Sequence, residues 1–287
     1  MSLTENYQGG CLCGAVTYQV HGPFNLMVHC HCSMCRKHHG SAFATFVGAP
    51  LMGFKWLRGE DQIDSYASST NGVRRFCRHC GSVMPTLIED MDLAMIPAGN
   101  LQGDLHMRPQ CHVFVGSKAP WYQITDDLPQ HEEFPPELGM GGVTRPIVEA
   151  PEGVVAGSCL CNSIMYEITG TPIRTAHCHC SRCQRGRSAA HASNLFYKLA
   201  DFRFTREAAP ISDYRVLEAR YFAVAFCSKC GGAVPRVSVE RGVVVVPAGA
   251  LDTDPGVRPA VHIFVGNKAS WFQITDATPQ FEAAPPV

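Results

Sequence analysis

The 287-residue sequence has little net charge, a low share of charged residues and no long apolar run. Its 24 Lys and Arg nearly balance its 25 Asp and Glu, which leaves a formal net charge of −1. The basic footprint expected for nucleic acid or an anionic membrane is therefore absent from the chain as a whole. No apolar stretch approaches the roughly 20 residues that span a bilayer, and the start, MSLTENYQGG, lacks the regions of a signal peptide. We expect neither a nucleic-acid partner nor a membrane partner.

Cysteine, by contrast, is abundant. The chain has fifteen, an odd number, and several are spaced too closely to pair with one another. Dense disulfides suit small secreted domains, whereas 287 residues with 46% hydrophobic content are enough for two ordinary globular domains. We therefore expect reduced thiolates on metal ions, in a cytoplasmic protein.

Fourteen of the cysteines form a set of seven that occurs twice. The first set is Cys11, Cys13, Cys30, Cys32, Cys35, Cys77 and Cys80, and the second is Cys159, Cys161, Cys178, Cys180, Cys183, Cys227 and Cys230. The first five positions are displaced by 148 residues and the last two by 150. A net insertion of two residues is thus predicted in a loop between Cys183 and Cys227.

The repeat extends beyond cysteine and marks a duplicated domain. Residues 112–126, HVFVGSKAPWYQITD, return as residues 262–276, HIFVGNKASWFQITD, with eleven of fifteen positions identical. A period near 150 is a whole domain and not a solenoid unit. We predict domains at 1–131 and 152–287 and a Gly- and Pro-rich linker at 132–151. We expect the copies to pack face to face through apolar sheet surfaces about a pseudo-twofold axis, as an intrachain pseudo-dimer that is compatible with a monomer.

Within a copy, the pattern predicts short strands and almost no helix. Alternating or β-branched segments lie at 15–20, 43–47, 63–66, 83–88, 93–96 and 111–115. Only a turn of helix is expected after Cys35 and after Cys183. The fold class is mainly β.

The outer cysteines of each set are typical of a closed structural zinc site. A CxxC followed by Gly resembles a zinc knuckle, and an extended CxC places two more sulfurs on one face. The predicted four-thiol sites are Cys11, Cys13, Cys77 and Cys80, and Cys159, Cys161, Cys227 and Cys230.

The inner cysteines have no obvious fourth ligand in the sequence. They are Cys30, Cys32 and Cys35 in the first copy, and Cys178, Cys180 and Cys183 in the second. Three protein ligands with one exchangeable position are typical of a catalytic zinc, and we expect these six cysteines to hold one. A second structural site closed by His112 or His262 is the alternative, and iron in place of zinc also stays open.

Three thiolates weaken zinc as a Lewis acid. Such a site is therefore better suited to holding an exogenous thiol as its thiolate than to making hydroxide. The bound thiolate would then act as a nucleophile without a protein base.

With CxCG, CHCSxCRKxxGSxF, FCxxCG and HxFVGSKAPWxxITDDLPQ in order, the first copy resembles the family of the glutathione-dependent formaldehyde-activating enzyme and centromere protein V. The second copy is similar to a more divergent member. The resemblance implies a β-tent fold of small antiparallel sheets in each copy and the same division of zincs, hence four per chain, two structural and two open. It also implies a carbon–sulfur lyase that joins formaldehyde to the glutathione thiol, giving S-hydroxymethylglutathione.

The copies diverge directly after the inner cluster, in a segment expected to line the pocket. Residues 36–41, RKHHGS, become residues 184–189, QRGRSA, and Phe43 is matched by His191. The two sites are thus expected to prefer different thiols, or one to be inactive. His191 is interpreted as a pocket acid or base, a closing metal ligand or a polar residue at a strand end.

Several basic residues are candidates to bind the two carboxylates of a peptide-like thiol. They are Arg36, Lys37, Arg108 and Lys118 in the first copy, and Arg185, Arg187, Arg258 and Lys268 in the second, with His112, His191 and His262 as polar neighbours. Trp121 and Trp271 are predicted to be core residues, Asp126 and Asp276 to cap the following turn, and Cys111, matched by Val261, to be a buried thiol. The alternative functions are a non-catalytic glutathione or thiol carrier and an interaction module on a zinc scaffold.

Overall fold

The computed structural model describes residues 5–70, 72–135 and 150–284, and short strands dominate it. The predicted fold class, mainly β with small sheets, is confirmed. None of the helices in these ranges is long and apolar enough to cross a bilayer. The fifteen cysteines are all free thiols, which agrees with the expectation of reduced cysteine.

The first half contains ten strands and one α-helix. The strands are β1 Asn6–Gly10, β2 Thr17–His21, β3 Leu26–Cys30, β4 Ala44–Pro50, β5 Phe54–Arg58, β6 Ile63–Ser69, β7 Gly72–Cys77, β8 Thr86–Ile88, β9 Leu93–Pro97 and β10 Cys111–Val113. The helix is α1, Ser33–His39, and the 3-10 turns are η1 Leu51–Gly53, η2 Glu60–Gln62, η3 Glu89–Met91, η4 Ala98–Asn100 and η5 Val115–Ser117. Each predicted strand overlaps an observed one, and the helical turn begins two residues before Cys35.

The second half repeats this order with small changes. Its strands are β11 Val154–Ser158, β12 Ile164–Thr169, β13 Arg174–Cys178, β14 Ala192–Lys198, β15 Phe202–Glu207, β16 Ile211–Arg215, β17 Ala223–Cys227, β18 Arg236–Ser238, β19 Val243–Pro247, β20 His262–Ile263 and β21 Gln280–Phe281. Its helix is α2, Ser181–Arg187, and its 3-10 turns are η7 Leu199–Asp201, η8 Ala248–Ala250 and η9 Val265–Asn267.

Each half is built from three sheets in the same arrangement. A main sheet runs β10-β3-β4-β9-β8 in the first half and β18-β19-β14-β13-β20-β21 in the second. Smaller sheets, β1-β2-β5 and β11-β12-β15, and hairpins, β6-β7 and β16-β17, complete the halves. Most pairs are antiparallel, but β10 joins β3, and β20 joins both β13 and β21, in parallel. The predicted insertion lies in the β16–β17 turn, because Tyr66 faces Arg74 across its hairpin whereas Tyr214 faces Val224.

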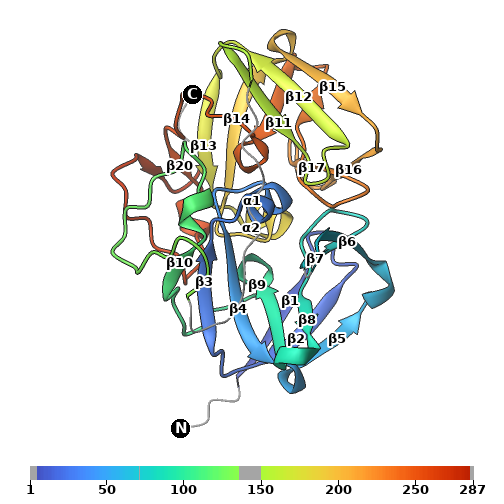
Figure 1. The fold of residues 1–287 in the computed structure, drawn as a ribbon, viewed down its shortest axis with the longest axis vertical. Helices are drawn as coiled ribbons and strands as arrows, with labels where there is room; N and C mark the ends of the chain where they lie inside the picture. Colours follow the sequence, from blue (N-terminus) through green and yellow to red (C-terminus); the bar gives the residue numbers. More distant parts are fainter. Residues whose placement is uncertain (1–4, 71, 136–149, 285–287) are drawn as a thin grey trace.

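The two halves pack tightly against each other about a pseudo-twofold relation. Figure 1 shows them one above the other, with α1 and α2 together between them. One apolar cluster includes buried residues of both, such as Phe43 and Trp121 with Leu195 and Trp271. The hydroxyls of Thr125 and Thr275, equivalent residues, are 2.5 Å apart.

The helix of each half meets the Pro-Ala-Gly turn of the other. A Cβ on Gly99 would overlap the backbone of Ala189, and one on Gly249 would overlap the backbone of Ser41. Only glycine permits such an approach. The segments after the inner clusters therefore lie partly in the contact between the halves, and the expectation that they line a pocket stays a prediction.

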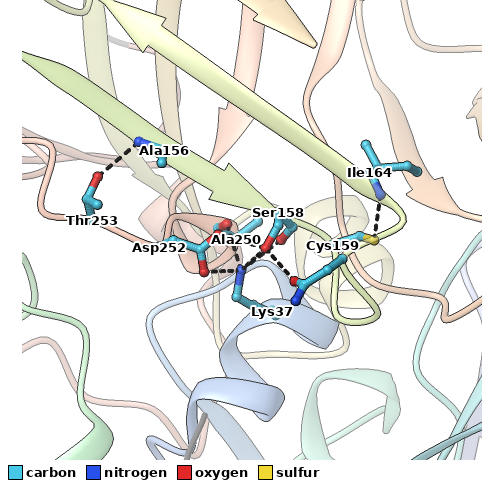
Figure 2. A network of polar contacts seen from close by, with 9 residues as sticks. Lys37, Ala156, Ser158, Cys159, Ile164, Ala250, Asp252 and Thr253 are labelled. Carbon is cyan, nitrogen blue, oxygen red and sulfur yellow. Dashed lines mark hydrogen bonds and ion pairs between the residues drawn. The ribbon is translucent and has the colours of Figure 1, made fainter. Parts of the chain in front are cut away.

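Lys37 is part of this contact (Figure 2). Its side chain is 4% exposed, lies 2.6 Å from the Asp252 carboxylate and donates hydrogen bonds to the backbone carbonyl and hydroxyl of Ser158. A charged partner, Asp252, is thus already in place. This corrects the expectation that Lys37 binds a substrate carboxylate.

The end of the first half packs onto its own domain. The ring of Phe134 lies 4.6 Å from that of Phe114, and His131 exchanges backbone hydrogen bonds with the β10 region. Most of the predicted linker, residues 136–149, lies outside the described residues. The boundaries at 131 and 152 stay predictions.

Candidate metal centres

The outer cysteines of the first half converge from two distant segments. Cys11, Cys13, Cys77 and Cys80 have sulfur atoms that all lie within 4.8 Å of one another. The sulfurs of Cys11 and Cys13 are 3.4 Å apart, and those of Cys13 and Cys77 are 3.7 Å apart. Ligands about 2.3 Å from a tetrahedral zinc are separated by about 3.8 Å, whereas a disulfide is about 2.05 Å long. The spacing fits a metal ion.

The second half repeats this centre with Cys159, Cys161, Cys227 and Cys230. Its sulfur separations are 3.5 Å for Cys159–Cys161 and 3.8 Å for Cys161–Cys227. In both halves the glycine after CxxC is left-handed, with φ of 69° at Gly81 and 67° at Gly231, as a knuckle turn requires. Backbone amides of Val16 and Ile164 donate to the first sulfur of each centre.

The inner cysteines of the second half also have sulfur atoms close enough together to bind one metal ion. The sulfurs of Cys178, Cys180 and Cys183 all lie within 4.8 Å of one another. The strand β13 supplies Cys178, Cys180 precedes the helix, and Cys183 lies in its first turn. The amide of Cys183 donates to the Cys180 sulfur, which caps α2. Three buried or half-buried thiols thus converge without a fourth protein ligand in this group.

The inner cysteines of the first half are arranged more loosely. The Cys30 and Cys35 sulfurs are 3.5 Å apart, but Cys30, Cys32 and Cys35 are not among the groups whose sulfurs all lie within 4.8 Å. Here the guanidinium of Arg74 donates a hydrogen bond of 3.2 Å to the Cys35 sulfur. Sequence reasoning missed Arg74. Its signal was the position three residues before the CxxC, where the second copy has Val224.

One thiol in each inner cluster ionises most readily. Hydrogen bonds from the Cys30 and Cys35 thiols lower the pKa of Cys32, and those from Cys178 and Cys183 lower the pKa of Cys180. A cluster that stabilises thiolate in this way suits a cationic metal.

His31 and His179, each between two inner cysteines, form a hydrogen-bonded chain with a second histidine and a carboxylate. In the first half, His31 Nε2 is 2.8 Å from His112 Nδ1, and His112 Nε2 is 3.0 Å from Asp126. The second half repeats it, with 2.8 Å between His179 and His262 and 3.1 Å from His262 to Asp276. Asp126 and Asp276 accept the Nε2 protons of His112 and His262. The Nδ1 atoms of these two rings are therefore acceptors, and His31 and His179 donate to them from Nε2.

These hydrogen bonds determine whether His112 and His262 can be metal ligands. Both ring nitrogens of each are engaged, so neither closes an inner centre as a metal ligand. His191 packs its ring 4.4 Å from that of His177, and it belongs to none of the metal-binding groups of the described residues. Asp126 and Asp276 also accept from the amides of Leu128 and Thr278, which confirms the predicted caps.

Of the remaining basic candidates, some lie near the thiols and one takes part in the contact between the two halves. Arg36 is 8% exposed and interacts electrostatically with Cys32 and Cys35. Arg187 likewise interacts with Cys183. The backbone carbonyl of Arg185 accepts from Ser82 of the other half, and no described contact joins its side chain to a thiol.

Among the described residues, no hydrogen bond or ion pair joins Arg108, Lys118, Arg258 or Lys268 to a thiol. Two cavities of about 520 and 400 Å³ open between the halves, and the lining includes Lys118 and Arg258 in the larger and Arg108 in the smaller, with no cysteine in either. Arg108 and Arg258 pair with Asp104 and Asp254. The ammonium groups of Lys118 and Lys268 donate to the backbone carbonyls of Tyr122 and Phe272.

Three core predictions are confirmed. Trp121 and Trp271 are 2% and 3% exposed. Cys111 is buried in β10, and burial raises the pKa of its thiol, as expected of a structural cysteine.

A duplicated, mainly β chain with three thiol clusters that could each hold a metal ion defines the class of protein. The family model described as glutathione-dependent formaldehyde-activating enzyme matches residues 6–117 and 154–267. The chain belongs to this family.

Two relatives and one solved structure are similar to parts of the chain. A Halomonas elongata protein named for the same enzyme is 26% identical over 134 residues, which are 41% of this chain and 80% of that protein. A Schizosaccharomyces pombe protein named as an uncharacterized lyase is 30% identical over 78 residues, 27% of this chain and 55% of that protein. A crystal structure of a Rhodobacter sphaeroides protein shares 27% identity, covering 33% of this chain and 88% of that one, with a TM-score of 0.29.

Proposed function

We propose that the protein is a zinc-dependent carbon–sulfur lyase that acts on the adduct of a small thiol and an aldehyde. The reaction would be the joining of glutathione and formaldehyde to S-hydroxymethylglutathione, in which a carbon–sulfur bond forms and the thiol proton ends on the former carbonyl oxygen. The partner would be a small thiol such as glutathione. Fifteen free cysteines favour a reducing compartment, for which we propose the cytoplasm.

The observation that carries this proposal is the difference between three-thiol and four-thiol clusters within one domain. Four thiolates complete a tetrahedral shell, and three leave one position for a ligand from solution. We propose four zincs per chain, two closed at the outer cysteines and two open at the inner ones. At an open site the metal would keep the sulfur of a small thiol deprotonated and close to the protein.

The residues of the chain would act by holding this arrangement in place. The outer centres join β1–β2 to the turn after β7 in one half and β11–β12 to the turn after β17 in the other, and so fix the domain. His31, held by His112 and Asp126, anchors the backbone between Cys30 and Cys32. The same anchor acts between Cys178 and Cys180. Preorganised ligands of this kind lower the cost of binding a metal and a thiol together.

The test combines metal analysis with kinetics at dilute formaldehyde. We expect four zincs per chain and an acceleration of adduct formation over the uncatalysed reaction. Cys32→Ser and Cys180→Ser should each reduce zinc by one, and the variant of a working site should slow the reaction by at least about tenfold. Magnetisation exchange between free and adduct glutathione measures the rate.

Cys111→Val is the matched control, because Cys111 is buried, outside the clusters and replaced by Val261 in the second half. It should keep four zincs and the full rate. Two zincs per chain, or thiol binding without any acceleration of adduct formation, would contradict the proposal that the protein is an enzyme. The second outcome would support a thiol carrier instead.

A further inference from the structure

The two inner clusters differ in the charge placed around them. In the first half, Arg74 donates from Nη1 to the Cys35 sulfur and from Nε to the hydroxyl of Ser68, with 3.2 and 3.1 Å between the atoms. Ser68 in turn donates to the backbone carbonyl of Gly72. Hydroxyl and sulfur therefore hold the guanidinium in one orientation beside the thiols.

The second half has no equivalent of this arrangement. The hairpin register places Val224 opposite Tyr214, as Arg74 is opposite Tyr66. Ser68 is matched by Val216. A cation, Arg187, does lie near Cys183. Burial lowers the pKa of Arg187, and its electrostatic interaction with Cys183 partly offsets this lowering. Within the described residues of this half, however, no guanidinium donates a hydrogen bond to an inner sulfur.

Arg36 adds a second asymmetry. Its Nε and Nη1 atoms are buried and have no hydrogen-bond partner among the described residues. The equivalent residue, Gln184, is neutral and is satisfied by the backbone carbonyls of His179 and Asn267, at 2.5 and 2.6 Å. Arg36 already interacts electrostatically with Cys32, Asp252 and Cys35, but buried N–H groups without a hydrogen-bond partner are costly, so its Nε and Nη1 are donors that an anionic ligand would satisfy.

Charge balance gives these differences a consequence. Three thiolates and one divalent metal carry a net charge of −1, and a fourth thiolate brings it to −2. In a buried site this repulsion is weakly screened, and nearby cations offset it. An N–H···S bond also draws charge from the ligand sulfur, which leaves the metal a stronger acceptor.

We propose that the inner centre of the first half is the thiol-binding site and that Arg74 and Arg36 make it so. Arg74 is a positioning residue that compensates the thiolate charge, and Arg36 binds a carboxylate of the incoming thiol. The second inner centre, with Val224 and Gln184, holds a metal but binds an anionic thiol weakly. This inference rests on the proposed function and names which copy carries it.

The experiment is calorimetric titration of the zinc-loaded full chain with glutathione. We expect one binding equivalent per chain, kept in Cys180→Ser and lost in Cys32→Ser. Arg74→Met should weaken binding by about 10- to 100-fold, the range found for partners of metal ligands, without changing the zinc content. Val224→Met, at the equivalent position, is the matched control and should leave binding as in wild type.

A second probe separates the two arginines. Mercaptoethanol has a thiol and no carboxylate, so Arg74→Met should weaken its binding as much as that of glutathione, whereas Arg36→Gln should weaken glutathione binding more than mercaptoethanol binding. Glutathione should be weakened by both variants. On the cobalt-loaded chain, the sulfur-to-metal charge-transfer band that grows on thiol addition reports the same binding without any turnover.

The outcomes distinguish this inference from the proposed function. Two equal glutathione equivalents, unchanged binding in Arg74→Met, or an equal loss in Val224→Met would overturn the inference and leave the lyase proposal standing. Loss of zinc in Arg74→Met would overturn it as well, because Arg74 would then be structural. No thiol binding by the wild type would refute the proposed function itself.

Discussion

At the scale of single residues, the interior of the protein contains an unusual number of neutral histidines. Burial lowers the pKa of His29, His38, His39, His177 and His191. A charged imidazole would lose its hydration there, and the neighbouring histidines would repel it. Between the halves, His39 shows the clearest structural role, because its Nδ1 donates to the backbone carbonyl of Arg187 at 2.8 Å.

His39 should make stability depend on pH. Burial lowers its pKa from 6.5 to about 4, so the unfolded chain binds a proton in a window where the folded chain does not. The stabilisation is complete above pH 6.5 and is lost as the pH falls toward 4, by about 3 kcal/mol over the window. His39→Gln keeps a donor for Arg187 and should remove this part of the dependence.

Chemical denaturation of both proteins between pH 7 and pH 4 measures the effect. Metal content must be followed at each pH, because acid also releases thiolate-bound metals. Parallel pH profiles for the wild type and the variant would show that His39 does not titrate in this window.

At the scale of elements, the contact of α1 with the second half brings an outer cysteine cluster and an inner one together. Lys37 lies two residues after Cys35, and its partner Ser158 directly precedes Cys159 (Figure 2). Asp252 completes the network from the turn after η8 and also accepts from the Ser158 hydroxyl. The equivalent of Lys37 is Arg185 on α2, which forms no ion pair among the described residues. The pseudo-symmetry is therefore broken at this contact.

Removing one member of the pair should be costly. Lys37→Met leaves the buried Asp252 carboxylate without its cation, and we expect the free energy of unfolding to fall by about 3–5 kcal/mol. The double variant Lys37→Met with Asp252→Leu should recover most of this loss, because no isolated charge remains. Arg185→Met is the control and should change stability by less than about 1 kcal/mol. A double variant as unstable as the single one would show that the charge is not the cause.

At the scale of the whole molecule, the two halves share one interior. Apolar residues of both belong to a single buried cluster, and Phe76 and Phe226 of the two hairpins pack on Gly231 and Gly81 of the opposite half. The cavities that contain Asp126 and Asp276 are likewise lined from both sides. Each half thus completes the surface of the other.

Separated halves should consequently depend on each other. When residues 1–135 and 150–287 are produced as two chains in one cell, we expect them to copurify as a one-to-one complex. Either half alone should aggregate or associate with itself, because the shared apolar surface is exposed. Size-exclusion chromatography with a tag on one half tests this. A monomeric, cooperatively folding single half would contradict it.

The sequence by itself determined the duplication, the mainly β class and the grouping of cysteines into outer fours and inner threes. These follow from spacing and from short-range rules: CxxCG forms a knuckle, alternation forms strands, and a CxC in extended chain points two sulfurs one way. The place of the two-residue insertion and the burial of Trp121, Trp271 and Cys111 were predictable for the same reason.

Only the tertiary structure decided which polar groups meet across long distances. It placed Lys37 on Asp252, His112 between His31 and Asp126, and Arg74 on Cys35, in pairs separated by 14 to 215 residues. His112 and Asp126, 14 residues apart, are the first and last residues of the repeated segment 112–126, so this contact alone lies within a local motif. The long-range contacts depend on how the sheets stack and how the halves dock. The residues that flank a buried charge or ring nitrogen in the sequence do not indicate either arrangement. The sequence therefore shows the repeated metal ligands, and the fold shows that the surroundings of the two inner clusters are not equivalent.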